Sequence, residues 1–318
     1  MATTKEIKNR IKSVKDTQKI TNAMYLISST KMTKAKKELD NTRPYFEMLK
    51  KQIITMIQMT ESADNYYFQD RSVAGEEPLP PGSEEKETVA YLVITADKGL
   101  AGAYNQNVIK EAMRLIKGTP SYKLFVVGEY GRRYFEARGM SIDQSFLYTA
   151  QNPTLERARE ITQVLTGLYS KGQITKVYIV YTDFRNGLMG GDVDSMVLLP
   201  FKRENFVLDR EEKEEDKELK TTYTEYMPNV TAVLNNIVPS YVAGYIYSAL
   251  VDSFCSEQNA RMTAMNSAND NAEEIMSELS VEYNRVRQAA ITQEITEVAA
   301  GAKALRRKKK KKTGEAVS

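Results

Sequence analysis

A loop with two glycines is the part of this sequence that most resembles a chemical site. The segment TADKGLAGAYNQN, residues 95–107, follows an apolar run and precedes a helical pattern. In open α/β sheets nucleotides bind at such a position, where backbone N–H groups can hold phosphate. Gly99, Gly102 and Lys98 could form a cradle, but their spacing matches neither GxGxxG nor GxxxxGK[ST]. We therefore expect Asp97 and Lys98 to organise the loop or to meet a partner.

The composition excludes several kinds of active site. The chain of 318 residues has no His, no Trp and one Cys. Without His, neither a Ser-His-Asp nor a Cys-His arrangement can be built, and the common Cys/His zinc site is also excluded. A single Cys forms no intrachain disulfide, which is typical of a cytoplasmic protein, and we expect Cys255 to be a packing residue. The prediction is no catalytic residue, no metal and no cofactor.

Residues 88–200 alternate between buried strands and helices. This alternation is typical of βαβ units and predicts a mostly parallel, Rossmann-like sheet. A final strand after the turn-rich RNGLMGG is expected to be an antiparallel edge. The expected strands are Thr88–Thr95, Tyr122–Val127, Lys176–Thr182 and Val193–Leu199, and the expected helices are Asn105–Ile116, Tyr130–Ala137 and Leu155–Tyr169.

Long helical patterns flank this domain on both sides. Residues 240–305 contain no proline, and apolar residues recur there at every third or fourth position. Such a helix would be roughly 100 Å long at 1.5 Å per residue, too long for a domain of this size to bury. Residues 3–58 show a similar pattern, with Gln18 and Lys31 interrupting the apolar seam and Pro44 expected to kink or divide the helix. We expect the two helices to pair antiparallel.

The first helix is strongly basic. From Lys5 to Lys37 it carries ten Lys or Arg residues against Glu6 and Asp16. Two interpretations remain open, a solvated helix face and a surface that faces an acidic partner.

The expected organisation has six segments. The sequence contains no run of 18 or more apolar residues, so we expect no transmembrane helix. The N-terminus lacks the apolar core of a secretory signal. Residues after Leu305 are polar and basic, and we expect them to be disordered. The segments are an N-terminal coiled-coil helix (1–60), a linker (61–87), a Rossmann-like domain (88–200), an acidic loop (201–231), a C-terminal coiled-coil helix (232–305) and a basic tail (306–318).

Three blocks together resemble one family. They are IKNRIKSVKDTQKITNAMYLISSTKMTKAK near the N-terminus, TADKGLAGAYN in the inserted domain, and SEQNARMTAMNSANDNA with ITQEITEVAAGAKAL near the C-terminus. In this order they resemble the gamma subunits of bacterial F-type ATP synthases. The family's DKGLCG loop is kept except that Ala101 stands in place of its Cys.

The resemblance implies a function without chemistry. It implies a central rotor shaft that mechanically couples ion flow to ATP synthesis or hydrolysis, present in one copy per complex. The implied partners are the α and β subunits of the head, the epsilon subunit and the ring of c subunits. The implied location is peripheral, on the cytoplasmic face of the bacterial inner membrane. Partner contacts are implied, by similarity, for Met24, Arg261, Gln288, Thr292, Glu294, Thr296 and Glu297.

Two other functions stay open on the residues alone. One is an α/β nucleotide-binding protein whose coiled-coil arms serve oligomerisation. The other is a nucleic-acid or membrane adaptor acting through Arg306–Lys312, although no aromatic residues accompany that run to stack on bases.

Overall fold

The fold was analysed in a computed structural model, which describes residues 3–59, 67–68, 87–147, 150–184, 192–201 and 225–314. Most of the expected linker 61–87 and of the acidic loop 201–231 lies outside these residues. Two long helices, α1 (Thr4–Met59) and α6 (Val230–Gly314), flank the remaining elements. The chain forms two compact units: Met1–Leu26 with Met265–Ser318, and Ile27–Ala264. Both long helices contribute to both units, so each unit is described in turn.

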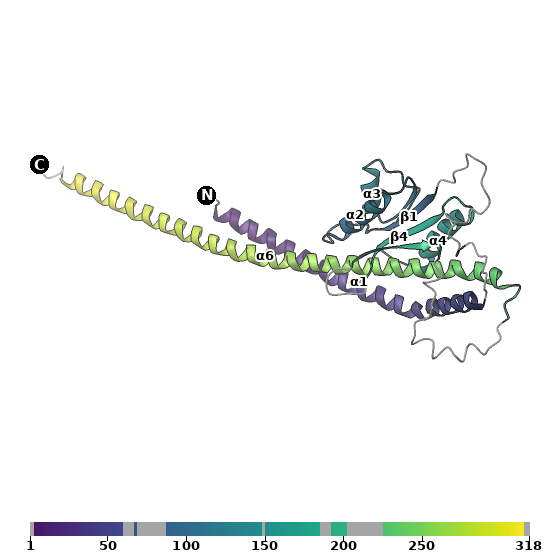
Figure 1. Cartoon of the computed structure of the whole chain (residues 1–318). Helices are drawn as coiled ribbons and strands as arrows, with labels where there is room; N and C mark the ends of the chain where they lie inside the picture. The colour runs from purple at the N-terminus through teal and green to yellow at the C-terminus, as the bar shows by residue number, and fades with distance from the viewer. Residues whose placement is uncertain are drawn as a thin grey trace. The chain divides into compact units, whose positions relative to one another are not determined.

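The larger unit, 27–264, contains a five-stranded sheet (Figure 1). Its order is β3-β2-β1-β4-β5, parallel except for the antiparallel β4–β5 pair. The expected parallel sheet and antiparallel edge strand are therefore confirmed, while β3, three residues long, was not predicted from sequence. The strands are β1 (Thr88–Ile94), β2 (Ser121–Val127), β3 (Gln144–Phe146), β4 (Lys176–Thr182) and β5 (Val193–Leu199).

Helices cover both faces of this sheet. The helices α2 (Tyr104–Ile116) and α3 (Glu129–Glu136) share one core with inward residues such as Val93 and Val126. On the opposite face, α4 (Leu155–Ser170) packs into a core that also takes in α1 and α6 (Figure 1). Alternate strand residues point to opposite faces of the sheet. Because both faces are covered, apolar residues occur at successive positions of these strands.

The first part of α6 is buried against its own sheet as well as against α1. Leu234, Val238, Val242 and Ile246 are fully buried in the same core as the strand residues. From its sequence alone, this helix is expected to use its apolar stripe to pair with the N-terminal helix. Because both a sheet face and a helix are available within the unit, this part of α6 completes an ordinary domain core.

In the larger unit α1 and α6 run antiparallel. Gly244 of α6 lies against the ring of Phe46, and further along α6 the Cys255 thiol lies 3.9 Å from the carbonyl oxygen of Met32. Cys255 is buried, which confirms its expected packing role. Apolar spacing along the first helix predicts that Ile27 lies on the seam, but Ile27 is 55% exposed and the neighbouring Ser28 is buried.

The smaller unit, 1–26 with 265–318, is a two-helix assembly that is also antiparallel. Gln18 donates to Glu273 over 3.2 Å, and Thr21 bonds to Asn269. Ile7, Ala272 and Leu279 are the buried apolar residues described in it besides Met265. Every described side chain of α6 from 287 to 304 is exposed. The C-terminal part of α6 therefore continues beyond the residues that α1 covers within this unit.

Both long helices continue through a proline. The helix α6 begins at Val230 and contains Pro239, and α1 is not divided at Pro44, where a kink or a division was expected. Buried residues on either side of each proline, such as Val238 and Leu39, supply packing that offsets the lost hydrogen bond. The tail 306–314 is helical rather than disordered, since Arg and Lys are good helix formers and no glycine occurs there before Gly314.

Candidate functional site: the loop after strand β1

The loop 95–103 is fixed to the sheet where β1 ends. Thr95 donates from Oγ1 to the carbonyl oxygen of Val127 over 2.8 Å and accepts from the N–H of Gly131 over 3.0 Å. Gly128 has a φ of 93°, and a Cβ there would overlap the Thr95 carbonyl. Glycine is required at this position both for its backbone conformation and for the close approach of α3 to β1.

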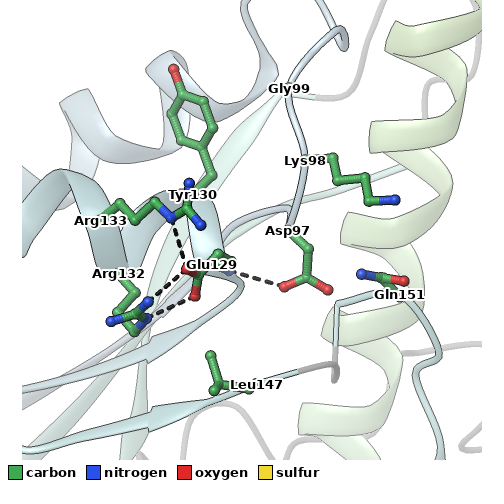
Figure 2. Close-up of a pocket in the computed structure, with 9 residues that line it drawn as sticks. All are labelled: Asp97, Lys98, Gly99, Glu129, Tyr130, Arg132, Arg133, Leu147 and Gln151. Atoms are coloured by element: carbon green, nitrogen blue, oxygen red, sulfur yellow. Dashed lines mark hydrogen bonds and ion pairs between the residues drawn. The ribbon is translucent and has the colours of Figure 1, made fainter.

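A pocket of about 710 Å³ opens beside this loop, at the carboxyl ends of β1 and β2. Figure 2 shows basic and acidic side chains gathered around it. It is the place where a nucleotide would be sought in this class of fold. Its lining residues are Asp97, Lys98, Gly99, Glu129, Tyr130, Arg132, Arg133, Leu147 and Gln151.

Three charged residues of this pocket, Glu129, Arg132 and Arg133, are ion-paired within the chain. Asp97 accepts from the N–H of Glu129 over 2.9 Å, so a carboxylate already caps the N-terminus of α3 (Figure 2). Glu129 in turn bonds Arg132 at 2.6 Å and Arg133 at 2.7 Å. These hydrogen bonds hold the pKa of the Glu129 carboxyl at about 2, and the bond from Arg132 is the larger cause. A phosphate group would have to displace two carboxylates, so the geometry disfavours nucleotide binding, and the hydrogen bond accepted by Asp97 ties the loop to α3.

A second group of polar residues is buried where the loop meets α6. Arg261 forms an ion pair with Glu257 at 2.6 Å and donates to the carbonyl oxygen of Gly99 over 3.2 Å. On the loop side, Asn105 accepts from the N–H of Ala96 over 2.9 Å. Burial raises the pKa of the Glu257 carboxyl, and the charge of Arg261 opposes that rise. In the sequence this group is marked only by an i,i+4 acid–base pair on a helix.

The residues expected to contact partners fall into both units. Arg261 belongs to the larger unit and is 9% exposed, because its own loop covers it. Met24 belongs to the smaller unit and is half-buried. The other five are exposed on the C-terminal part of α6, where Thr292 donates to the carbonyl oxygen of Gln288 over 2.9 Å. Those five are Gln288, Thr292, Glu294, Thr296 and Glu297.

The described residues contain neither a candidate metal site nor a candidate membrane-spanning helix. No group of three or more Cys, Asp or Glu residues among them could hold a metal ion. No helix in the described part of the chain is long and apolar enough to cross a membrane.

Comparison with known proteins decides the family. The family model described as ATP synthase matches residues 3–305. The chain is 42% identical over 301 residues to the ATP synthase gamma chain of Caldanaerobacter subterraneus subsp. tengcongensis, over 94% of this chain and 98% of that relative. The chain belongs to the ATP synthase gamma chain family. This confirms the family indicated by the three sequence blocks, whose members are subunits without an active site of their own.

Further gamma chains and a solved structure agree. The chain is 37% identical over 309 residues to the gamma chain of Acetobacterium woodii, named as sodium ion specific, covering 94% of this chain and 98% of that one. A chain in the Euglena gracilis mitochondrial ATP synthase structure of OSCP, F1 and c-ring aligns with a TM-score of 0.62 and 16% identity. The alignment covers 95% of the present chain and 94% of the Euglena gracilis chain. This last likeness shows that the gamma chain fold is shared.

Proposed function

We propose that this gamma chain is the central-stalk rotor subunit of a bacterial ATP synthase. It couples ion flow through a membrane ring to ATP synthesis or hydrolysis by turning within the catalytic head, and it performs no chemistry. Its relatives are named gamma chains, and the solved chains that share its fold come from a central stalk with c-ring and from a rotor.

The observation that carries this proposal is the exposed C-terminal part of α6. From Arg287 to Ala304 the helix continues with every side chain exposed, including Ile291, Ile295 and Val298. These three follow one another at spacings of four and three, so they lie on one face of the helix. An exposed apolar stripe does not stabilise an isolated helix. When other chains enclose the helix, burial of the stripe stabilises the assembly.

The partners follow from the same reasoning. The α and β subunits of the head are proposed to surround the C-terminal part of α6 and the basic part of α1. The α/β domain is proposed to meet the epsilon subunit and the c-ring, with one gamma chain per complex. The complex would place the chain peripherally on the cytoplasmic face of the inner membrane.

The exposed polar residues on α6 are the proposed contacts with the head. Gln288, Thr292 and Glu297 lie with Glu294 and Thr296 on the part of the helix that α1 does not cover. Met24 is proposed as a contact near the levers that β subunits present to the shaft. For Arg261, burial beneath its own loop favours an indirect role, argued in the next subsection.

The test is rotation in the reconstituted complex. Lys110, an exposed residue of α2, is changed to Cys and labelled with a bead, since the native Cys255 is buried. With the head fixed to a surface, we expect ATP to drive continuous rotation of the bead in one direction. A chain that assembles into an ATP-hydrolysing head whose bead does not rotate would overturn the proposal. The purified chain alone should neither hydrolyse ATP nor bind it saturably.

A further inference from the structure

Arg261 is a charged residue that its own chain has covered. Only 11% of its side-chain surface is exposed, and 8% of that of Glu257, one helical turn before it on α6. Its Nη2 atom serves both Glu257 at 2.6 Å and the carbonyl oxygen of Gly99 at 3.2 Å. Removing a guanidinium from water is costly unless it is paired and hydrogen-bonded, so this arrangement constrains both groups that it joins.

The loop has a second attachment to the same stretch of α6. Ala101 is buried with Ala96 and Tyr104, and Ala260 of α6 packs against this small cluster. The Gly99 carbonyl and the Ala101 side chain therefore lie against neighbouring residues of one helix. Between them, Leu100 has no such cover and is 67% exposed.

Leu100 also has an unusual backbone conformation. Its φ is 63°, the left-handed region that side-chain-bearing residues rarely adopt. Strain of this kind persists only where surrounding contacts determine the conformation, and it is concentrated at functional positions. Here the surrounding contacts are the Gly99 carbonyl before Leu100 and the buried Ala101 after it.

We propose that Arg261 is a positioning residue, which together with Glu257 fixes the 97–102 loop on α6 and holds Leu100 exposed. On this view Arg261 influences rotation through the loop of its own chain, and does not act by touching a partner. The first test below is independent of the rotor function, and the second rests on it.

The first test is hydrogen exchange of the purified full-length chain. In Arg261→Met, which keeps the length of the side chain but removes the donors, we expect peptides covering 97–103 to exchange at least tenfold faster. Peptides of β1 should be unchanged. Arg261→Lys can still reach one of its two partners, and an intermediate rate is expected. Arg159→Met, at an exposed position on α4 of the same unit, is the matched control and should match the wild-type chain.

Two outcomes of this test overturn the proposal. One is wild-type exchange of the loop in both Arg261 variants. The other is faster exchange spread evenly over the whole unit, which would indicate a general loss of stability. If Arg261→Met does not fold, Arg261→Lys and Glu257→Gln decide the matter by the same measurement.

The second test is a double-mutant cycle in the assembled synthase, read as the rate of ATP hydrolysis. If Arg261 acts through the loop, Arg261→Met should cost severalfold less rate in a Leu100→Ala background than in the wild type. Independent, multiplicative effects, or a Leu100→Ala complex of wild-type rate, would overturn the proposal. Failure of the chain to join a synthase would instead contradict the rotor function and leave the exchange result intact.

Discussion

Gly244 of α6 lies so close to Phe46 of α1 that a single added Cβ atom would overlap the aromatic ring. Here the backbone of one helix packs directly on a side chain of the other. Phe46 and the residues around Gly244 belong to the core that joins the helix pair to the sheet. The close contact therefore couples the coiled coil to the α/β domain within the larger unit.

Gly244→Ala should destabilise the chain by about 1–3 kcal/mol, because overpacking forces the ring or the helix to move. Denaturant unfolding monitored by circular dichroism measures this. Gly301→Ala is the control, since a Cβ there meets nothing within 4 Å, and alanine in place of glycine favours a helix by about 0.5–1 kcal/mol. Phe46→Leu should recover part of the loss, and equal stability of Gly244→Ala and wild type would contradict the packing described.

Glu129 should make the chain sensitive to acid. Its folded pKa of about 2 lies below its ordinary value of 4.5, so its stabilisation is fully present above pH 4.5 and is lost as pH falls toward 2. Glu129→Gln should therefore be less stable than wild type at pH 7, and the difference should shrink between pH 4.5 and 2.

Two further comparisons test the same ion pairs: the effect of added salt, and a Glu→Gln change elsewhere on the surface. Because the Glu129 carboxylate is partly exposed to solvent and Arg133 is exposed, added salt should reduce the difference at pH 7. Glu160→Gln, at an exposed position of α4, is the matched control variant, and the stability of Glu129→Gln is compared with it at each pH. A pH-independent difference for Glu129→Gln would mean that the ion pairs to Arg132 and Arg133 contribute nothing.

The Cys255 thiol should be nearly unreactive in the folded chain. Burial raises its pKa to about 12, so at pH 8 almost none is thiolate, the form that attacks a disulfide reagent. We expect labelling by Ellman's reagent to be at least tenfold slower than for the chain in denaturant. The second cysteine of a Lys110→Cys variant should react quickly, and comparable rates for both thiols would show that Cys255 is accessible.

A proline in the smaller unit should uncouple the motor. Leu279 of α6 is 7% exposed, and proline there removes a helical hydrogen bond and clashes with the preceding turn, at a cost of about 3 kcal/mol or more. In membrane vesicles carrying the synthase, Leu279→Pro should abolish most ion-driven ATP synthesis. Leu279→Met, which conserves volume and helix, should retain it, and normal synthesis by the proline variant would contradict a rigid shaft.

Truncation after Leu305 should leave the ATP hydrolysis of the assembled complex unchanged. The removed residues include Arg306–Lys312, which extend beyond the blocks shared with the family, and the family model itself ends at residue 305. We propose that they emerge above the head into solvent. Hydrolysis by the truncated complex, compared with that of the full-length complex at the same protein concentration, measures this. A large loss would show that the basic segment contacts the head.

The sequence by itself determined most of the elements and their order, but not the short strand β3. Apolar runs without gaps predicted β1, β2 and β4, because a strand buried on both faces needs apolar residues at every position. The absence of His excluded Ser-His-Asp and Cys-His arrangements, and the glycine spacing matched neither phosphate-binding fingerprint. Local patterns sufficed for these conclusions, since they depend on backbone periodicity and on residue types alone.

Only the tertiary structure decided how the charged and small residues are used. Sequence spacing could not show that Arg261 is covered by the Gly99 loop, since these residues are far apart in the chain and meet only through packing on the sheet. Nor could it show that Ser28 is buried in preference to Ile27, or that α1 continues undivided through Pro44. In each case contacts from distant segments outweighed the local preference of the residue, and such contacts leave no periodic signal in the sequence.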